Sequence, residues 1–210
     1  MPEFATAAAT ADPAGFALVD DRGERTWAEV GDALNRCANQ LHAVDLGSAR
    51  RIAVFAENAA EVALAHLGGL IAGASSVPVN FHLAADEAAY ILEDSDTRVL
   101  FVGPETAERG VAAARAAGVP MVIGWRCSDV DGVTDWDGWL AAGDPADPPM
   151  DVEPRPNLLY TSGTTGRPKG TELPPTMFAG GATVGEHLEA LKENNFVPFG
   201  THLVVGPMYH

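Results

Sequence analysis

A glycine- and hydroxyl-rich loop late in the chain carries the residues best suited to chemistry. The run reads Thr161-Ser162-Gly163-Thr164-Thr165-Gly166-Arg167-Pro168-Lys169-Gly170. Its glycines permit positive φ and close backbone approach, and its hydroxyls and successive N–H groups can surround phosphate oxygens. Lys169 adds a point charge, and Lys192 is the only other lysine in the sequence. The pattern predicts a phosphate-binding loop, although a flexible polar linker has a similar composition.

The loop differs from that of P-loop NTPases. Their pattern, G-x-x-x-x-G-K-[ST], places the lysine directly after the last glycine. Here Gly163 and Gly166 are three positions apart, and Lys169 follows Pro168. We therefore expect another type of phosphate loop, held between a strand on either side.

Other groups that could bind metal ions lack a supporting pattern. The acidic run that invites a calcium interpretation consists of Asp129, Asp131, Asp135 and Asp137. Its glycine comes too early and no glutamate closes a twelve-residue loop, so a solvated acidic loop is expected. The histidines without a partner at metal-ligand spacing are His42, His66 and His82. His187 is expected on the surface of a helix.

Composition and charge limit the classes of partner. The chain has 210 residues, enough for one domain or for one domain and part of another. Its 29 acidic and 13 basic residues give a net charge of −16, which disfavours binding to nucleic acid or to anionic membranes. The longest apolar run, residues 62–79, is interrupted by glycines and a histidine, so no membrane-spanning segment is predicted. The start of the chain lacks the pattern of a secretory signal, and two isolated cysteines fit a reducing cytoplasm. The oligomeric state stays open.

Hydrophobic periodicity predicts strands alternating with helices. Strands are expected at residues 16–19, 51–55, 76–79, 98–102 and 120–123. Helices are expected after the capping box that starts at Thr26, after a cap at Asn58, and over residues 85–92 and 105–117. Strands separated by helices need crossover connections. The expected fold class is therefore α/β, with a mainly parallel sheet covered by helices on both faces.

The chain divides at a proline-rich connector, Asp144–Pro156. We predict an α/β unit over residues 1–150 and the start of a second unit over residues 151–210. In the second unit, strands are expected at 157–161, 171–173 and 201–206, the loop at 162–170, and a helix at 176–192. Because no helix follows to cover the last apolar strand, the chain is expected to be part of a longer protein.

Residues 159–170 resemble the phosphate-binding signature of the adenylate-forming superfamily, which includes acyl-CoA synthetases, peptide-synthetase adenylation domains and luciferases. Two further stretches agree in order and spacing with the family: residues 26–30, and Pro207-Met208-Tyr209-His210. The resemblance implies the first subdomain and the start of the second subdomain of an adenylate-forming large domain. It also implies that a small C-terminal domain lies outside this chain.

The resemblance assigns roles to individual residues. It implies nucleotide binding by Thr161, Ser162, Gly163, Thr164, Thr165, Gly166 and Lys169. Within that set, the hydroxyls of residues 162, 164 and 165 and the ammonium of Lys169 would hold the β- and γ-phosphates, and Thr161 would touch Mg²⁺. His210 would border the acyl pocket and the adenylate. Lys169 and His210 are thus the expected catalytic residues.

The segment before the loop favours one branch of the superfamily. Residues 77–83, Val-Pro-Val-Asn-Phe-His-Leu, are nearer to the fatty or aryl acyl-CoA ligase form than to that of peptide synthetases. The implied activity is an ATP-dependent acyl-CoA ligase with ATP, Mg²⁺, CoA and a carboxylic acid, expected to be a fatty acid, as cofactors and substrates. Two alternatives stay open: a non-catalytic nucleotide-binding stub and an amino-acid-activating domain.

Overall fold

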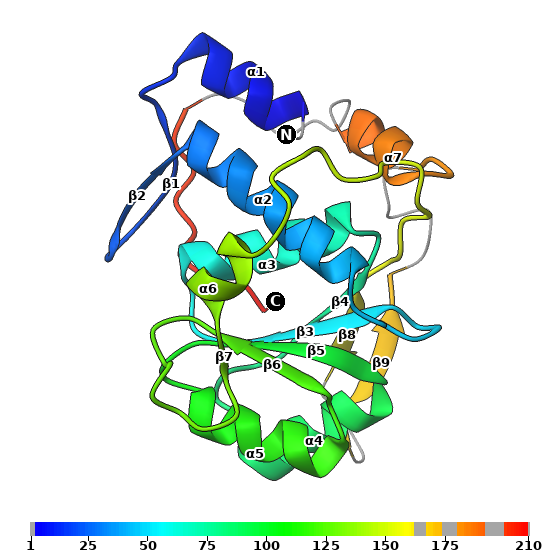
Figure 1. Cartoon of the computed structure of the whole chain (residues 1–210). Coiled ribbons are helices and arrows are strands. Elements are labelled where there is room, and N and C mark those ends of the chain that lie inside the picture. The colour runs from blue at the N-terminus through cyan, green and yellow to red at the C-terminus, as the bar shows by residue number, and fades with distance from the viewer. Residues whose placement is uncertain (1–2, 162–166, 174–179, 192–199, 210) are drawn as a thin grey trace.

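The computed structural model describes residues 3–161, 167–173, 180–191 and 200–209. Its centre is a five-stranded parallel sheet with the order β4-β3-β5-β6-β7 (Figure 1). The strands are β3 (Arg51–Phe55), β4 (Ser75–Pro78), β5 (Thr97–Val102), β6 (Met121–Gly124) and β7 (Thr134–Asp135). The predicted α/β class with a parallel sheet is confirmed.

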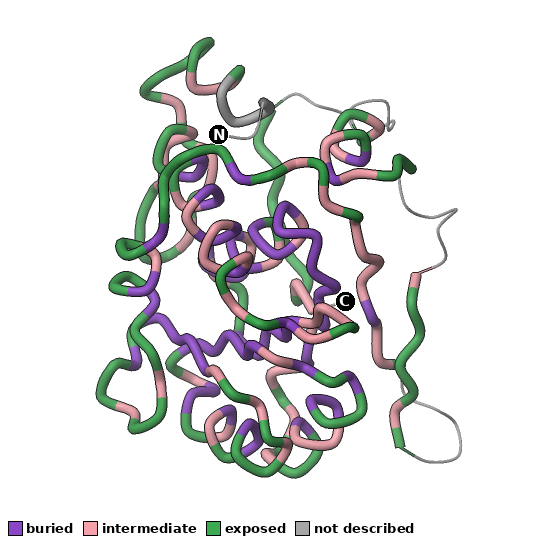
Figure 2. The backbone as a smooth tube through the Cα atoms, turned by 45° about the vertical axis from the view of Figure 1, so that its right-hand side comes forward, coloured by how far each residue is buried: buried purple, intermediate pink, exposed green. Residues whose placement is uncertain are grey.

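Helices cover both faces of the sheet (Figure 1). One face carries α2 (Trp27–His42), α3 (Ala60–Ile71) and α6 (Trp136–Ala141), and the other carries α4 (Ala85–Asp94) and α5 (Ala107–Ala117). Alternate residues of β3 enter the two cores: Ile52 and Val54 pack on the α2–α3 side, and Ala53 and Phe55 on the α4–α5 side. The strands β3 to β6 are therefore buried along most of their length, because both of their faces are covered, and buried backbone fills the middle of the molecule in Figure 2. The short edge strand β7 is exposed.

Helix starts follow the expected capping in one case and not in another. Thr26 caps α2 as predicted: its hydroxyl accepts from the Glu29 N–H, and the Glu29 carboxylate accepts from the Thr26 N–H at 2.7 Å. The predicted cap at Asn58 is wrong, since α3 begins after Ala59 and has no side-chain cap. The Asn58 side chain instead binds the backbone of residues 206 and 208.

The ends of the chain depart most from expectation. The strand predicted at residues 16–19 is β1 (Phe16–Asp20), which pairs with β2 (Gly23–Thr26) as an antiparallel hairpin outside the main sheet. A helix not expected from the sequence, α1 (Glu3–Ala11), precedes it. Residues 201–206 form no strand, because no strand of the described residues runs beside them; Leu203 and Val205 are 85% and 88% exposed.

The connector has no helix or strand, yet it is held in place along α2. Asn35 donates to the carbonyl of Pro145 at 2.9 Å, and Asn39 donates to the carbonyls of Asp144 and Ala146 at 2.9 and 2.8 Å. At its far end the Ser75 hydroxyl donates to the Pro156 carbonyl at 2.6 Å. These bonds bring the chain to the outer side of β4, where the second group of elements begins.

Beyond the connector, the residues that the structure describes form a hairpin and one helix. The hairpin pairs β8 (Leu158–Thr161) with β9 (Lys169–Glu172), and the helix is α7 (Val184–Leu191). Of the helix predicted at 176–192, residues 176–179 and 192 lie outside the described residues. Residues 180–183 are not helical, because Gly180 and Gly181 adopt φ of +93° and +99°, outside the helical region. Among the helices that the structure describes, none combines the length and the apolar character needed to cross a bilayer.

Candidate phosphate-binding site

The β8–β9 hairpin sets the two ends of the glycine-rich loop beside each other. The antiparallel register pairs Thr161 with Lys169 and Tyr160 with Gly170. Lys169 and Gly170, expected in the loop, therefore belong to β9, because pairing with β8 extends the strand to them. The predicted phosphate contacts Ser162, Gly163, Thr164, Thr165 and Gly166 lie outside the described residues, as does His210.

Helix α4 holds the hairpin through two tyrosines. The Tyr90 hydroxyl donates to the Pro168 carbonyl at 3.2 Å, and the guanidinium of Arg167 lies over the Tyr90 ring, 4.9 Å from its centroid. The Tyr160 hydroxyl donates to Asp94 Oδ2 at 2.5 Å. Burial and the bond to Asp94 raise the pKa of Tyr160, so the phenol stays a neutral donor. The sequence placed Tyr90 on a helix but offered no sign that it reaches the loop.

The root of the hairpin is tied to the main sheet by an arginine. Arg51 on β3 pairs with the Glu172 carboxylate at 2.6 Å and donates to the Ser95 carbonyl at 3.0 Å. Together with Asp94, Leu158, Tyr160 and Gly170, this pair lines a shallow hollow of about 360 Å³. Because two of the three guanidinium nitrogens of Arg51 already bind Glu172 and the Ser95 carbonyl, we assign this pair to holding the hairpin against the sheet and propose no ligand for the hollow.

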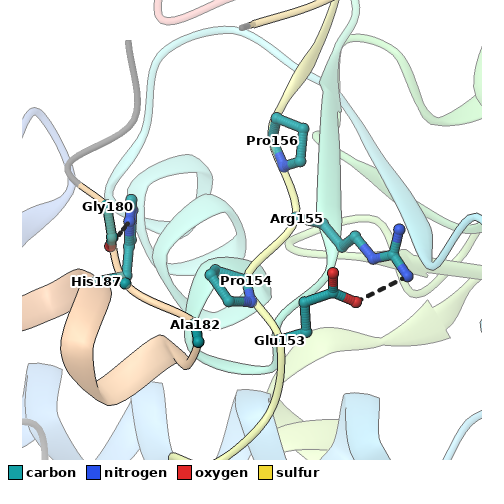
Figure 3. Close-up of a pocket in the computed structure, with 8 residues that line it drawn as sticks. Glu153, Pro154, Arg155, Pro156, Gly180, Ala182 and His187 are labelled. Carbon is teal, nitrogen blue, oxygen red and sulfur yellow. Dashed lines mark hydrogen bonds and ion pairs between the residues drawn. The ribbon is translucent and has the colours of Figure 1, made fainter. Parts of the chain in front are cut away.

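A larger hollow of about 540 Å³ lies between the connector and α7 (Figure 3). Figure 3 shows Pro154, Arg155 and Pro156 on one side, and Gly180, Ala182 and His187 on the other. Within it Arg155 pairs with Glu153 at 3.1 Å. His187, predicted at a surface, is buried, with Nδ1 3.2 Å from the Gly180 carbonyl oxygen. The prediction failed because the segment 180–183 folds back over the helix.

The segment that ends in the predicted acyl-site residue crosses the carboxyl end of β3. Asn58 Nδ2 donates to the Gly206 carbonyl, and the Met208 N–H donates to Asn58 Oδ1, both at 2.8 Å. The Tyr209 ring meets the Phe81 ring edge-on, with centroids 5.6 Å apart. Ligands of open parallel sheets bind at this carboxyl edge, so residues 206–209 lie where a substrate wall would be expected.

The described residues contain no group of three or more His, Cys, Asp or Glu side chains able to hold a metal ion. The acidic residues predicted as a solvated loop include Asp135, which caps α6 by accepting from the Gly138 N–H at 2.8 Å. Both cysteines, Cys37 and Cys127, are free and buried. A metal ion at the hairpin would therefore take most of its ligands from a bound phosphate compound and from water. The described hydroxyl group that directly precedes the loop belongs to Thr161.

Comparison with protein families gives one match over almost the whole chain. The model of the AMP-binding enzyme family matches residues 5–210. Among individual proteins, the long-chain-fatty-acid–CoA ligase FadD13 of Mycobacterium tuberculosis is 34% identical over 153 residues, covering 69% of this chain and 28% of that protein. The feruloyl-CoA synthase of an Amycolatopsis species is 32% identical over 191 residues, covering 88% of this chain and 34% of that protein.

A solved structure has a similar fold over most of this chain. The inhibitor-bound N-terminal domain of FACL13 from Mycobacterium tuberculosis superposes with a TM-score of 0.66 at 30% identity, over 80% of this chain and 42% of that one. The matched part of the chain thus spans about a third of the length of the two relatives.

Proposed function

Because this chain belongs to the AMP-binding enzyme family, we propose that it supplies the phosphate-binding part of an ATP-dependent acyl-CoA ligase. In the proposed reaction, a carboxylate attacks the α-phosphate of ATP and pyrophosphate leaves. The thiol of CoA then attacks the acyl-adenylate, and AMP leaves as the thioester forms. The complete reaction belongs to the longer protein that the proposal implies, with residues 1–150 and 151–210 as its first subdomain and the start of its second.

The register of the hairpin carries this proposal. Thr161 and Lys169 face each other across β8 and β9, so the ammonium and the hydroxyl flank the two ends of the glycine-rich loop. Lys169 is exposed, and no acidic group among the described residues pairs with it. An unpaired lysine beside a loop of successive N–H groups is suited to bind an oligophosphate.

The charge of the reactants explains why these groups matter. A carboxylate and ATP are both anions, and negative charge builds up on the leaving pyrophosphate. Cations and N–H groups fixed in advance near that charge lower the barrier because they need not reorganise. In this proposal Lys169 and the loop neutralise the β- and γ-phosphates, and His210 borders the acyl group.

The hydroxyl of Thr161 fits a magnesium ion that arrives with the nucleotide. Mg²⁺ prefers oxygen ligands and keeps several waters, so one hydroxyl and the phosphate oxygens form a reasonable donor set. The ion would supply positive charge to the phosphates. The chain's own contribution is to place Thr161 at the start of the loop, directly opposite Lys169.

The experiment that tests the site uses this chain and a simple probe. Titration of Mg²⁺-tripolyphosphate into the 210-residue chain is expected to show weak binding that Lys169→Ala reduces. Arg115→Ala is the matched control, since Arg115 is an exposed cation near the end of α5. Equal loss in both variants would mean nonspecific attraction and would refute the site.

In the longer protein, Lys169→Ala is expected to cost about 1.5 to 3 kcal/mol in ATP binding or pyrophosphate release, the range for a charge-assisted hydrogen bond. Acyl-dependent ATP–pyrophosphate exchange with fatty, aryl and amino acids identifies the activated acid. Exchange with amino acids alone would favour the amino-acid-activating alternative. Absence of exchange with any acid would favour the non-catalytic stub.

A further inference from the structure

Helix α4 touches the hairpin on both sides of the Thr161–Lys169 pair. Tyr90 and Asp94 are four residues apart, so they lie on the same face of α4. Tyr90 contacts residues 167 and 168, which come directly before Lys169 on β9. Asp94 accepts from Tyr160, which comes directly before Thr161 on β8. One helix face thus holds both strands at the point where the loop leaves them.

The contact at Tyr90 has two components that differ in kind. The hydroxyl binds the Pro168 carbonyl, which fixes the backbone one peptide away from Lys169. The ring lies under the Arg167 guanidinium, an interaction between a cation and an aromatic face. Tyr90 is half-buried, whereas Arg167 and Lys169 are exposed. The exposed start of β9 is therefore attached to the Tyr90 side chain, which α4 holds in place.

The missing side chain at position 170 supports the same anchoring. A Cβ at Gly170 would lie 3.1 Å from Tyr160 Cζ and 3.1 Å from Leu158 Cδ1. The glycine thus leaves room for the Tyr160 ring to lie along the hairpin and reach Asp94. Tyr90 on α4 and Tyr160 on β8 each bind the other element, so both contacts need the helix and the hairpin to lie close together.

From this arrangement we propose that Tyr90 is a positioning residue for the phosphate-binding site, which holds the Lys169 end of the loop ready for an oligophosphate. The inference rests on the proposed function. Tyr90 does not touch the phosphate; it reduces the range of positions open to Lys169 before binding. A site arranged in advance loses less conformational freedom when the anion binds.

The test compares Tyr90→Leu, Tyr90→Phe and the wild-type 210-residue chain. Tyr90→Leu removes both contacts and is expected to weaken Mg²⁺-tripolyphosphate binding about tenfold, while Tyr90→Phe keeps the ring and is expected to cost about threefold. In a double-mutant cycle, Arg167→Gln should cost less in the Tyr90→Leu background than alone, because one contact is lost in both. The control pair, Tyr90→Leu with Arg115→Gln, should show independent effects.

A second measurement reports on the strand without any ligand. Trypsin cleaves after Lys169, and pairing in β9 slows that cleavage, so Tyr90→Leu is expected to speed it several-fold with an unchanged urea midpoint. If Tyr90→Leu fails to fold, Tyr90→Phe carries the comparison, since it retains the ring. Unchanged cleavage and unchanged binding in a folded Tyr90 variant would overturn the inference. If the wild type binds no tripolyphosphate, an unchanged cleavage rate alone overturns it.

The two proposals fail in different ways. If Lys169→Ala abolishes tripolyphosphate binding and Tyr90→Leu does not alter it, the site stands and the role of Tyr90 is wrong. Suppose instead that Tyr90→Leu exposes Lys169 to trypsin, but Lys169→Ala leaves tripolyphosphate binding unchanged. The proposed function is then wrong, and Tyr90 only holds the start of β9 in place. That second result would also overturn the positioning role.

Discussion

The side chain of Asn58 accepts a hydrogen bond from the backbone N–H of Met208 at 2.8 Å, across 150 positions of sequence. The same side chain donates to the Gly206 carbonyl, also at 2.8 Å. The Asn58 side-chain amide, just after β3, therefore binds residues 206 and 208 of a segment that has no strand partner among the described residues. These two hydrogen bonds fix where residues 206–208 pass the carboxyl edge of the parallel sheet.

Asn58→Ala is expected to release the segment 206–208 without unfolding the chain. Each lost hydrogen bond is worth about 0.5 to 1.5 kcal/mol, and the loss falls on a peripheral segment. Hydrogen exchange at the Met208 amide should speed up by about tenfold or more while exchange in β3 and β5 stays the same. Asn39→Ala serves as control, since it removes two side-chain bonds to the backbone at a different place, the carbonyls of Asp144 and Ala146. If the Met208 amide exchanges equally slowly in both variants, the Asn58 side chain does not hold this segment.

His66 is expected to make stability depend on pH. Its side chain is half-buried, with Nδ1 2.6 Å from the Ser76 hydroxyl oxygen, and the loss of water around the ring lowers its pKa to about 4 from an ordinary 6.5. Between these values the unfolded chain binds a proton that the folded chain does not, so stability falls as pH decreases from about 6.5 to about 4. The expected loss is about 3 kcal/mol. Below pH 4 this contribution no longer changes.

Urea unfolding at pH 7, 6 and 5 measures the effect. His66→Gln should flatten most of the dependence over that range. His42 adds a smaller dependence of the same sign, because burial and the nearby Arg50 lower its pKa as well. If wild type and His66→Gln lose stability equally between pH 7 and pH 5, the neutral state of His66 is wrong.

His210→Ala in the longer protein is expected to change the dependence on the carboxylic acid more than the dependence on ATP. The residue follows directly on the segment that Asn58 and Phe81 hold at the carboxyl edge of the sheet. Steady-state kinetics with each substrate varied in turn separates the two effects. An effect confined to ATP would move His210 to the phosphate side of the site.

The 210-residue chain by itself is expected not to catalyse acyl-adenylate formation. The hairpin offers charge to the β- and γ-phosphates, but the match covers only 28% and 34% of the two relatives, so we expect the groups that hold adenine and ribose to lie in the rest of the longer protein. Losing one preorganised electrostatic contact costs about 10²- to 10³-fold in rate, so losing several removes measurable turnover. Acyl-dependent ATP–pyrophosphate exchange tests this. Exchange above background that disappears in Lys169→Ala would show the expectation to be wrong.

Local patterns in the sequence determined the elements whose stability is local or fully buried. The apolar run 51–55 and the Thr26 capping box specify β3 and the start of α2, because a buried strand and a capped helix are encoded within a few residues. The spacing of Trp136 and Trp139, three positions apart, is likewise local and typical of one helix face, and both are buried on α6. The phosphate-loop signature is also local, so the family could be recognised from it.

Tertiary structure decided which distant residues meet. The apolar run 201–206 has the composition of a strand, yet a strand needs a neighbour for its N–H and C=O groups, and composition does not reveal whether one is present. Asn58 has the residue type of a cap but binds residues 206 and 208, and His187 is covered by residues 180–183. Tyr90 was visible only as a helix position, and Asp94 lies beyond residue 92, where the predicted helix ended. Their role follows from the packing of α4 against the hairpin, a contact made by residues about 70 positions apart, which no local pattern encodes.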